Sequence, residues 1–217
     1  MKSTVKKISE ININMEETIK ALMIDRSALE MHIRRLTHLF KNDTQQQIEQ
    51  KLRNILARDN IFNVIMNEVA RSYEVTFDGD EIKNTAKQLE QHFQGRDPKV
   101  VEEIAKKAIT KSLIFGEIAK EWNITVSDQE VDDSLEQYYK FSNEPIRPFK
   151  EDKAKFENIR SAMLEEKIVN ELMRRFSKVR LDYEAIQRQF QEIAERQAAT
   201  KKQQEEAQQK EKNREFF

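Results

Sequence analysis

An internal repeat constrains this chain more than any other feature of its sequence. Residues 64–82 (VIMNEVARSYEVTFDGDEI) are matched without a gap, 49 positions later, by residues 113–131 (LIFGEIAKEWNITVSDQEV). All nine apolar positions of the first copy are apolar again in the second. Such a repeat predicts one helix–turn–helix module that is used twice. Two copies are too few for a solenoid, so the modules should share one core or project from it as two arms.

The composition favours an all-α protein. Of the 217 residues, 35% are charged and 38% hydrophobic, and there are only three glycines and three prolines to form turns. Few apolar residues for so many helices imply much exposed surface. We therefore expect an all-α fold with an elongated multi-helix body and two projecting helical arms.

Charge and cysteine content exclude several function classes. Lysine and arginine number 38 against 39 aspartate and glutamate, so no basic excess indicates specific nucleic-acid binding. The last segment, Arg196 to Glu215, has only two more basic than acidic residues, which leaves RNA or ribosome binding as a weak third hypothesis. The absence of cysteine fits a reducing compartment, and no apolar run is long enough for a membrane span. We expect a soluble cytoplasmic protein without a membrane partner.

Capping signals and apolar stripes predict the elements along the chain. Each range below is an expectation from the sequence alone. The expected elements are an extended segment over Ile8–Ile13, helices over Asn14–Ile24 and from Ser27 to Phe40, a long helix from Thr44 to Tyr73, helices that begin at Asp78, Asp97-Pro98 and Ser127, a loop over Asn143–Pro148, a long helix from Phe156 to Phe176 and a last helix from Asp182. Gly116, inside one of these helices, suggests a close helix crossing. The expected domains are an N-terminal region over residues 1–44 that packs on the body, a helical domain with both arms over residues 45–196 and a charged tail over residues 197–217.

No constellation in the sequence indicates catalysis. The three histidines, His32, His38 and His92, form no HExxH pattern, and the chain lacks the glycine-rich motifs that cradle phosphates and the GxSxG nucleophile motif. We expect no enzyme activity, no catalytic residue, no metal site and no cofactor.

Two segments carry a resemblance to a known family. Ala105–Glu130 (AKKAITKSLIFGEIAKEWNITVSDQE) and Phe156–Leu172 (FENIRSAMLEEKIVNEL) resemble the C-terminal chaperone domain of trigger factor, and the similarity extends over about residues 45–186. In the second segment Ile159, Arg160 and Leu164 to Lys167 are in register with the family's pattern. The resemblance implies an all-helical cradle with two arms, an architecture shared by the periplasmic chaperone SurA, with arm tips near Gln94–Asp97 and Phe141–Pro148.

The chain also departs from that family. No segment resembles its ribosome-docking signature, and there is no room for its prolyl isomerase domain, so neither ribosome attachment nor isomerase activity is implied. The residues before about 45 do not match, and the proline of the element that corresponds to Tyr73–Ile82 is missing. The chain thus resembles in kind the stand-alone trigger-factor-like proteins of mycoplasmas.

The resemblance implies an ATP-independent holdase that binds unfolded or nascent polypeptides in an apolar cradle. Such a surface needs exposed, adaptable apolar side chains. The candidates near arm roots and tips are Phe77, Phe93, Tyr138, Tyr139, Phe141, Ile146 and Phe149, although aromatic residues at helical spacing also suit an ordinary core. The alternative is a structural or adaptor protein that binds one dedicated partner, and a weak homodimer is also left open.

Overall fold

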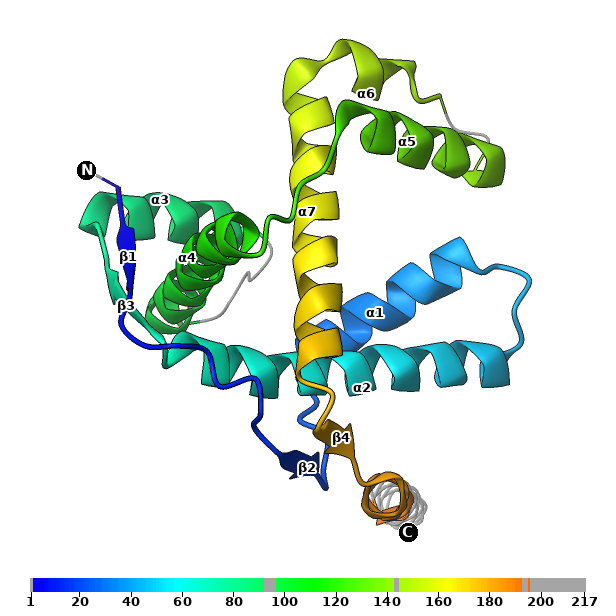
Figure 1. The fold of residues 1–217 in the computed structure, drawn as a ribbon. Helices are drawn as coiled ribbons and strands as arrows, with labels where there is room; N and C mark the ends of the chain where they lie inside the picture. Colours follow the sequence, from blue (N-terminus) through cyan, green and yellow to red (C-terminus); the bar gives the residue numbers. More distant parts are fainter. Residues whose placement is uncertain (1, 92–96, 143–144, 193–194, 196–217) are drawn as a thin grey trace, which may run out of the picture. The chain divides into compact units, whose positions relative to one another are not determined.

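The protein is mainly helical in the computed structural model. The structure describes residues 2–91, 97–142, 145–192 and 195, and the side chains of residues 26, 27, 141 and 142 are not described. The expected all-α class is confirmed (Figure 1). In the described ranges the strands form two two-stranded pairs, β1 with β3 and β2 with β4. The elements are β1 (Thr4–Lys7), β2 (Glu17–Ile19), α1 (Arg26–Leu39), α2 (Gln45–Ala70), β3 (Tyr73–Thr76), α3 (Gly79–Glu90), α4 (Pro98–Glu121), α5 (Asp128–Ser142), α6 (Arg147–Glu151), α7 (Lys153–Arg175) and β4 (Val179–Leu181), and residues 183–192 are helical as well.

The chain divides into two compact units that alternate along the sequence. The first unit comprises Met1–Met15 and Phe62–Ser177, and the second comprises Glu16–Ile61 and Lys178–Phe217. Helix α2 supplies residues to both of them. These units are defined by contacts within the structure, so they do not test the domain boundaries expected from the sequence at 44/45 and 196/197, which stay predictions.

In the first unit the repeat appears as a structural repeat. Each copy is the end of a long helix, a turn, a short extended segment and the start of a second helix, with α2 and α3 in the first copy and α4 and α5 in the second. Two pairs of equivalent positions are fully buried, Ile65 with Ile114 and Val69 with Ile118, whereas Phe77 is 39% exposed and its counterpart Val126 is buried. The centre of each copy is therefore packed alike, and the copies differ toward the second helix.

The two copies differ in the extended segment. In the first, Tyr73–Thr76 pairs with β1 in an antiparallel ladder that joins Thr4 to Thr76 and Lys7 to Tyr73. In the second, residues 122–125 form no strand, and Asn123 adopts a left-handed conformation with φ 51°. Asparagine tolerates that region better than most residues, so the chain turns there without a glycine.

Helix starts follow the predicted capping signals. Thr44 with Gln47, and Ser127 with Glu130, form reciprocal capping boxes at the starts of α2 and α5. Asp78 caps α3 by accepting a hydrogen bond from the Glu81 amide, at 3.0 Å. The Glu81 carboxylate instead accepts from the Ser3 amide, so the N-terminal segment completes this cap.

Each copy of the repeat opens a helical hairpin with its own core, as expected for the two arms. Helices α3 and α4 pack through one cluster, and α5, α6 and α7 enclose another (Figure 1). The first cluster is centred on Ile82, Ala105 and Ile109, and the second on Val126, Val131 and Leu135. The predicted first tip, Gln94–Asp97, lies outside the described residues except for Asp97.

The second unit corrects the prediction of a helix over Asn14–Ile24. Glu17–Ile19 forms β2, which pairs in parallel with Val179–Leu181, and this long-range pairing outweighs the local capping pattern. Beyond the strand, side chains satisfy the backbone in place of helical bonds. Asn60 accepts from the Met23 amide and donates to its carbonyl, and Gln189 does the same at Leu22.

Four smaller predictions are also corrected. The extended segment is Thr4–Lys7, which finds a partner in β3, and Ile8–Ile13 is irregular. Asp25 caps α1 in place of Ser27, because its carboxylate accepts from the Ala28 amide at 2.9 Å. The loop over Asn143–Pro148 is shortened by α6, which holds Pro148 in its first turn, where the missing N–H costs nothing. A β-carbon at Gly116 would meet no atom within 4 Å, so no close helix crossing explains that glycine.

Candidate polypeptide-binding site

An open apolar cavity lies on the second hairpin, which is formed by α5, α6 and α7. Its volume is about 250 Å³, and α5, α6 and α7 all contribute to its walls. The lining residues are Ser134, Leu135, Tyr138, Phe149 and Ile159. Ser134 and the Tyr138 hydroxyl are the polar groups of this set, and the remaining lining is apolar, so the cavity suits an aliphatic or aromatic group.

The helical period explains how α5 presents this surface. Val131, Leu135 and Tyr138 follow one another at spacings of four and three residues and so share one face. Val131 and Leu135 are buried against α7, whereas Tyr138 is 43% exposed. The stripe thus passes from core to surface along a single helix, and the cavity lies where that change occurs.

Helix α6 supplies Phe149 and is tied to α5 by an ion pair. The Lys150 ammonium lies 2.9 Å from the Asp132 carboxylate, and the hydrogen bond to Asp132 raises the pKa of Lys150. Ile146, just before α6, packs on the hydrophobic cluster of this hairpin. Both contacts hold the short helix in place and so fix the position of Phe149.

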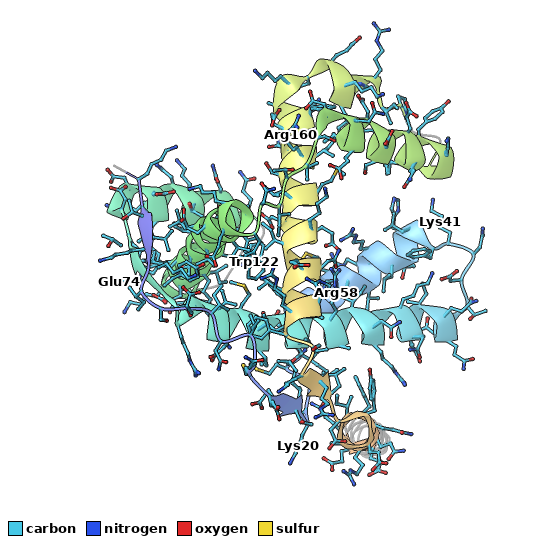
Figure 2. The ribbon with its side chains drawn as sticks, viewed as in Figure 1. Lys20, Lys41, Arg58, Glu74, Trp122 and Arg160 are labelled. Carbon is cyan, nitrogen blue, oxygen red and sulfur yellow. The ribbon has the colours of Figure 1, made fainter. Side chains whose placement is uncertain are left out.

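Two basic residues of α7 hold the start of α5. Arg160 donates to the Val126 carbonyl at 3.0 Å and pairs with Asp128, while Lys167 donates to the Thr125 carbonyl at 2.7 Å and pairs with Glu130. Figure 2 shows Arg160 on α7 next to the beginning of α5. The hydrogen bond from Lys167 is also the main reason why the pKa of Glu130 is lowered.

This arrangement gives a structural reason for the motif that carries the family resemblance. Arg160 and Lys167 are seven residues apart, about two helical turns, and therefore lie on one face of α7. Between them they hold the turn that begins the second hairpin. Glu165, in the same motif, instead forms an ion pair with Lys111 of α4, at 2.8 Å.

A polar hollow lies beside the same turn. It is lined by Trp122, Asn123, Ile124, Thr125, Lys167 and Glu171. Hydrogen bonds from Arg174 and then Arg175 lower the pKa of Glu171 to about 2, and the Arg175 guanidinium lies 3.8 Å from the centre of the Trp122 ring. The two charged residues of its lining already have partners, Glu130 for Lys167 and both arginines for Glu171, which indicates a structural role.

The structure places the predicted polypeptide-binding residues in different settings. Tyr138 and Phe149 meet at the cavity, and Tyr139 lies next to Tyr138 on α5 with 46% of its surface exposed. Ile146 supports the hairpin from within its core, and Phe77 is 39% exposed just before α3, in the other hairpin. Phe93 and the side chain of Phe141 lie outside the described residues.

Sequence reasoning missed three lining residues, Ser134, Leu135 and Ile159. Leu135 follows Val131, and Ile159 follows Phe156, at the spacing of an ordinary apolar stripe, and no local pattern separates a stripe residue that fills a core from one that borders a cavity. The change from leucine to tyrosine along the α5 stripe is the one signal that could have indicated this site.

The described residues include neither a metal cluster nor a membrane-spanning helix. No group of three or more histidine, aspartate or glutamate side chains there could hold a metal ion. Among the same residues, no helix is long and apolar enough to cross a bilayer. His32 lies 3.4 Å from the Asp59 carboxylate, and His92 falls outside the described residues.

Comparison with known proteins agrees with this architecture. Residues 99–174 match the family described as the C-terminus of bacterial trigger factor protein (TF). That match covers α4, α5, α6 and nearly all of α7, and therefore the whole cavity and both basic residues that hold the start of α5. It is a match to a chaperone-type family rather than to a family of enzymes.

Relatives that match most of this chain come from mycoplasmas. The uncharacterized protein MG377 of Mycoplasma genitalium and its homolog in Mycoplasma pneumoniae are each 32% identical over 177 residues, which span 81% of this chain and 92% of the relative. The crystal structure of the hypothetical Mycoplasma protein MPN555 superposes with a TM-score of 0.74 at 30% identity, covering 84% of this chain and 92% of that one. The chain therefore belongs to the trigger-factor-like protein family that includes the mycoplasma protein MG377.

Proposed function

We propose that this protein is an ATP-independent chaperone that binds unfolded or nascent polypeptides through the second hairpin. The observation that carries the proposal is the apolar cavity between α5, α6 and α7, which borders the exposed rings of Tyr138 and Phe149. It lies within the segment that matches the trigger factor C-terminus. An exposed apolar patch on a stable helical frame is the physical requirement for a protein that holds non-native chains.

The chemistry of the patch suits clients of many sequences. Its contacts with a client would be made by aromatic faces and aliphatic groups, which have little directional preference. No charged side chain lines the cavity, so a client would pay no penalty for burying an unpaired charge there. Leucine, isoleucine, phenylalanine and tyrosine side chains of a client all suit such a surface.

Affinity at this one patch should be low. Burying about 400 Å² of apolar surface yields roughly 10 kcal/mol in gross terms. The association cost of about 4–15 kcal/mol cancels most of that gain. Release would then be rapid without nucleotide, and several patches, with Tyr139 and Phe77 among the candidates, would add avidity.

The remaining expectations belong to the same proposal. We propose that the protein works in the cytoplasm, without a cofactor, a catalytic residue or a specific nucleic-acid partner. The absence of cysteine and the balanced charge of the sequence support this setting. Ribosome attachment is not part of the proposal, and a weak homodimer would be compatible with it.

The test is suppression of aggregation of a chemically unfolded client, diluted with equimolar protein and no ATP. The paired changes Tyr138→Ser and Phe149→Ser remove the apolar rim and leave the buried cluster in place. Val100→Ser, an exposed apolar residue of α4, is the matched control. We expect suppression by the native chain and the control, and weaker suppression by the double variant with unchanged helicity.

The alternative of one dedicated partner predicts a different outcome. A chain that binds one folded protein would suppress the aggregation of none of several unrelated clients. Equal suppression by the native chain and the double variant would instead support holdase activity and show that the second hairpin is not its site. The two results separate the function from its location.

A further inference from the structure

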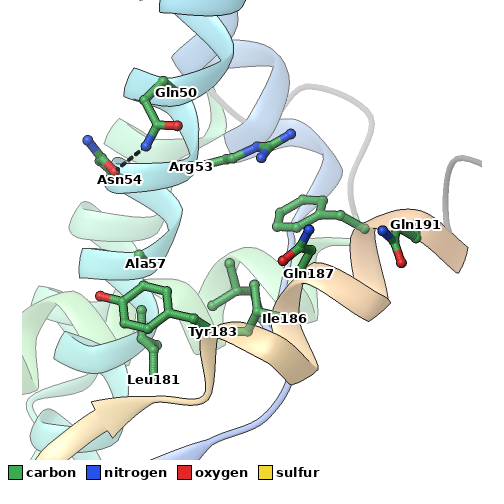
Figure 3. A pocket seen from close by; sticks show the side chains of 11 residues that line it. Gln50, Arg53, Asn54, Ala57, Leu181, Tyr183, Ile186, Gln187 and Gln191 are labelled. Carbon is green, nitrogen blue, oxygen red and sulfur yellow. Dashed lines mark hydrogen bonds between the residues drawn. The ribbon is translucent and has the colours of Figure 1, made fainter.

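The second unit contains a larger pocket that the proposed function does not use. Its volume is about 580 Å³, within the range of pockets that take small ligands or peptide segments. One wall is α2 and the other is the helical run over residues 183–192 (Figure 3). The lining residues are Leu22, Gln50, Arg53, Asn54, Ala57, Leu181, Tyr183, Ile186, Gln187, Phe190 and Gln191.

Side-chain hydrogen bonds hold the frame of this pocket. Gln189, on the helical run, accepts from the Leu22 amide at 2.8 Å and donates to the Leu22 carbonyl at 2.9 Å. Asp182 caps the same run by accepting from the Ala185 amide, and its own amide donates to the Ile19 carbonyl of β2. These bonds fix the run against the segment that carries Leu22, so the pocket is preformed.

The floor of the pocket is apolar. Leu22 and Ile186 are buried, and Leu181 and Phe190 are half-buried. Tyr183 stands at the edge with 76% of its surface exposed. An aromatic or aliphatic side chain that entered the pocket would meet groups of its own kind.

The rim is made of amides. Gln50 and Asn54 come from α2, and Gln187 and Gln191 from the opposite wall (Figure 3). Gln50 donates to the Asn54 side-chain oxygen at 3.2 Å, so these two amides of α2 are linked to each other. Side-chain amides both donate and accept, so they match the alternating N–H and C=O groups of an extended main chain.

Arg53 is the one charged residue of the lining, and no acidic side chain accompanies it. Its guanidinium lies 5.4 Å from the centre of the Phe190 ring, a stacking contact that leaves its N–H groups unused. Among the described residues this guanidinium forms no ion pair or hydrogen bond. The Arg53 guanidinium can therefore bind a carboxylate in the pocket. A guanidinium and a carboxylate can form two parallel hydrogen bonds.

From these three features we infer that the pocket binds an extended polypeptide segment in which an aromatic or aliphatic residue neighbours an acidic one. The apolar side chain lies on the floor, the main chain lies along the amide rim, and the carboxylate pairs with Arg53. Nucleic acid is disfavoured, because a single cation gives little phosphate affinity. The inference goes beyond the proposed function and does not rest on it, because all the lining residues belong to the second unit.

The test uses the full chain and capped synthetic peptides, followed by the NMR signals of side-chain amides and arginine Nε groups. The probe is acetyl-Gly-Ser-Phe-Glu-Gly-Ser-amide. One comparison peptide carries Gln in place of Glu, and another carries Ser in place of Phe. Phenylpropionate, which has a ring and a carboxylate but no peptide main chain, distinguishes a polypeptide from a small organic acid.

The probe should shift the signals of Arg53, Asn54, Gln187 and Gln191, and Arg53→Gln should weaken its binding about tenfold, the loss expected for one charge-assisted contact. The Gln-containing peptide should bind the native chain and Arg53→Gln alike. Arg188→Gln, on the same helical run but outside the lining, is the matched control and should bind as the native chain does.

Several results would overturn the inference. They are shifts confined to residues outside the pocket, equal affinity for the Glu and Gln peptides, and equal losses for Arg53→Gln and Arg188→Gln. Phenylpropionate binding as tightly as the peptide would exclude a role for the amide rim and with it the polypeptide ligand. Should Arg53→Gln fail to fold, the comparison of peptides on the native chain still decides the point. Arg53→Gln should still suppress client aggregation, because that activity is assigned to the second hairpin. Failure of the pocket inference can therefore be told apart from failure of the proposed function.

Discussion

Replacing Lys167 with methionine tests whether α7 holds the start of the second hairpin. The change keeps the apolar stem of the side chain and removes its ammonium group. That group donates to the Thr125 carbonyl at 2.7 Å and pairs with the Glu130 carboxylate. The capping box between Ser127 and Glu130 needs no lysine and should persist.

The expected cost follows from the hydrogen bond to the carbonyl of Thr125. A hydrogen bond that involves a charged group contributes about 1.5–3 kcal/mol when it is well shielded. The Lys167 side chain is 37% exposed, and water can partly replace it at Thr125, so we expect the free energy of unfolding to fall by about 1–2 kcal/mol. In a chain of this length, such a loss lowers the melting temperature by about 2–8 °C.

Trp122 provides the assay, because it is the only tryptophan of the chain and lines the same polar hollow as Lys167. Urea titration followed by its fluorescence reports on the first unit. Lys155→Met is the matched control, since Lys155 lies on the same helix and pairs with Asp152, three residues away. We expect the control to change stability by less than about 0.5 kcal/mol. Equal effects of the two substitutions would refute the assignment of Lys167 to the turn.

Three further predictions concern other parts of the chain. Arg174 and Arg175 lower the pKa of Glu171 to about 2, so the ionised carboxylate contributes its full stability above the ordinary pKa of 4.5 and loses it as the pH falls toward 2. In an acid titration followed by Trp122 fluorescence, Glu171→Gln should therefore lose less stability than the native chain. Asn60→Ala leaves the Met23 backbone without its partners and should cost about 1–3 kcal/mol by thermal unfolding, whereas an unchanged melting temperature would contradict this role. Gly116→Ala places a β-carbon in open space within α4 and should stabilise the chain by up to about 1 kcal/mol in a urea titration, and destabilisation would reveal a constraint on that position.

Local signals predicted the elements whose partners are close in sequence. The capping boxes at Thr44 and Ser127 are completed three residues later, so a short window of sequence contains all of their hydrogen bonds. The repeat predicted the two hairpins because each hairpin core is built from neighbouring helices. Those contacts can be read without knowledge of the rest of the chain.

Predictions failed where the deciding partner is distant. The Asn14–Glu17 pattern suits a helix cap, but Glu17–Ile19 instead pairs with Val179–Leu181. The same distance hid the pocket of the second unit, whose walls come from about residue 50 and from beyond residue 180. At the second hairpin the sequence predicts Tyr138 and Phe149. Leu135 is a buried core residue that also borders the cavity, and a local pattern does not indicate where neighbouring side chains leave space.

The alternation of the two units along the chain has a consequence for biosynthesis. Strand β2 is made early, yet its partner β4 is about 160 residues further on, after every element of the first unit has been made. On a ribosome the hairpins can therefore complete their cores while residues 16–61 still lack their sheet partner. Closing that long loop is slow for an unstructured chain, and a folded first unit shortens the effective distance. The order of synthesis thus favours folding of the first unit before the second.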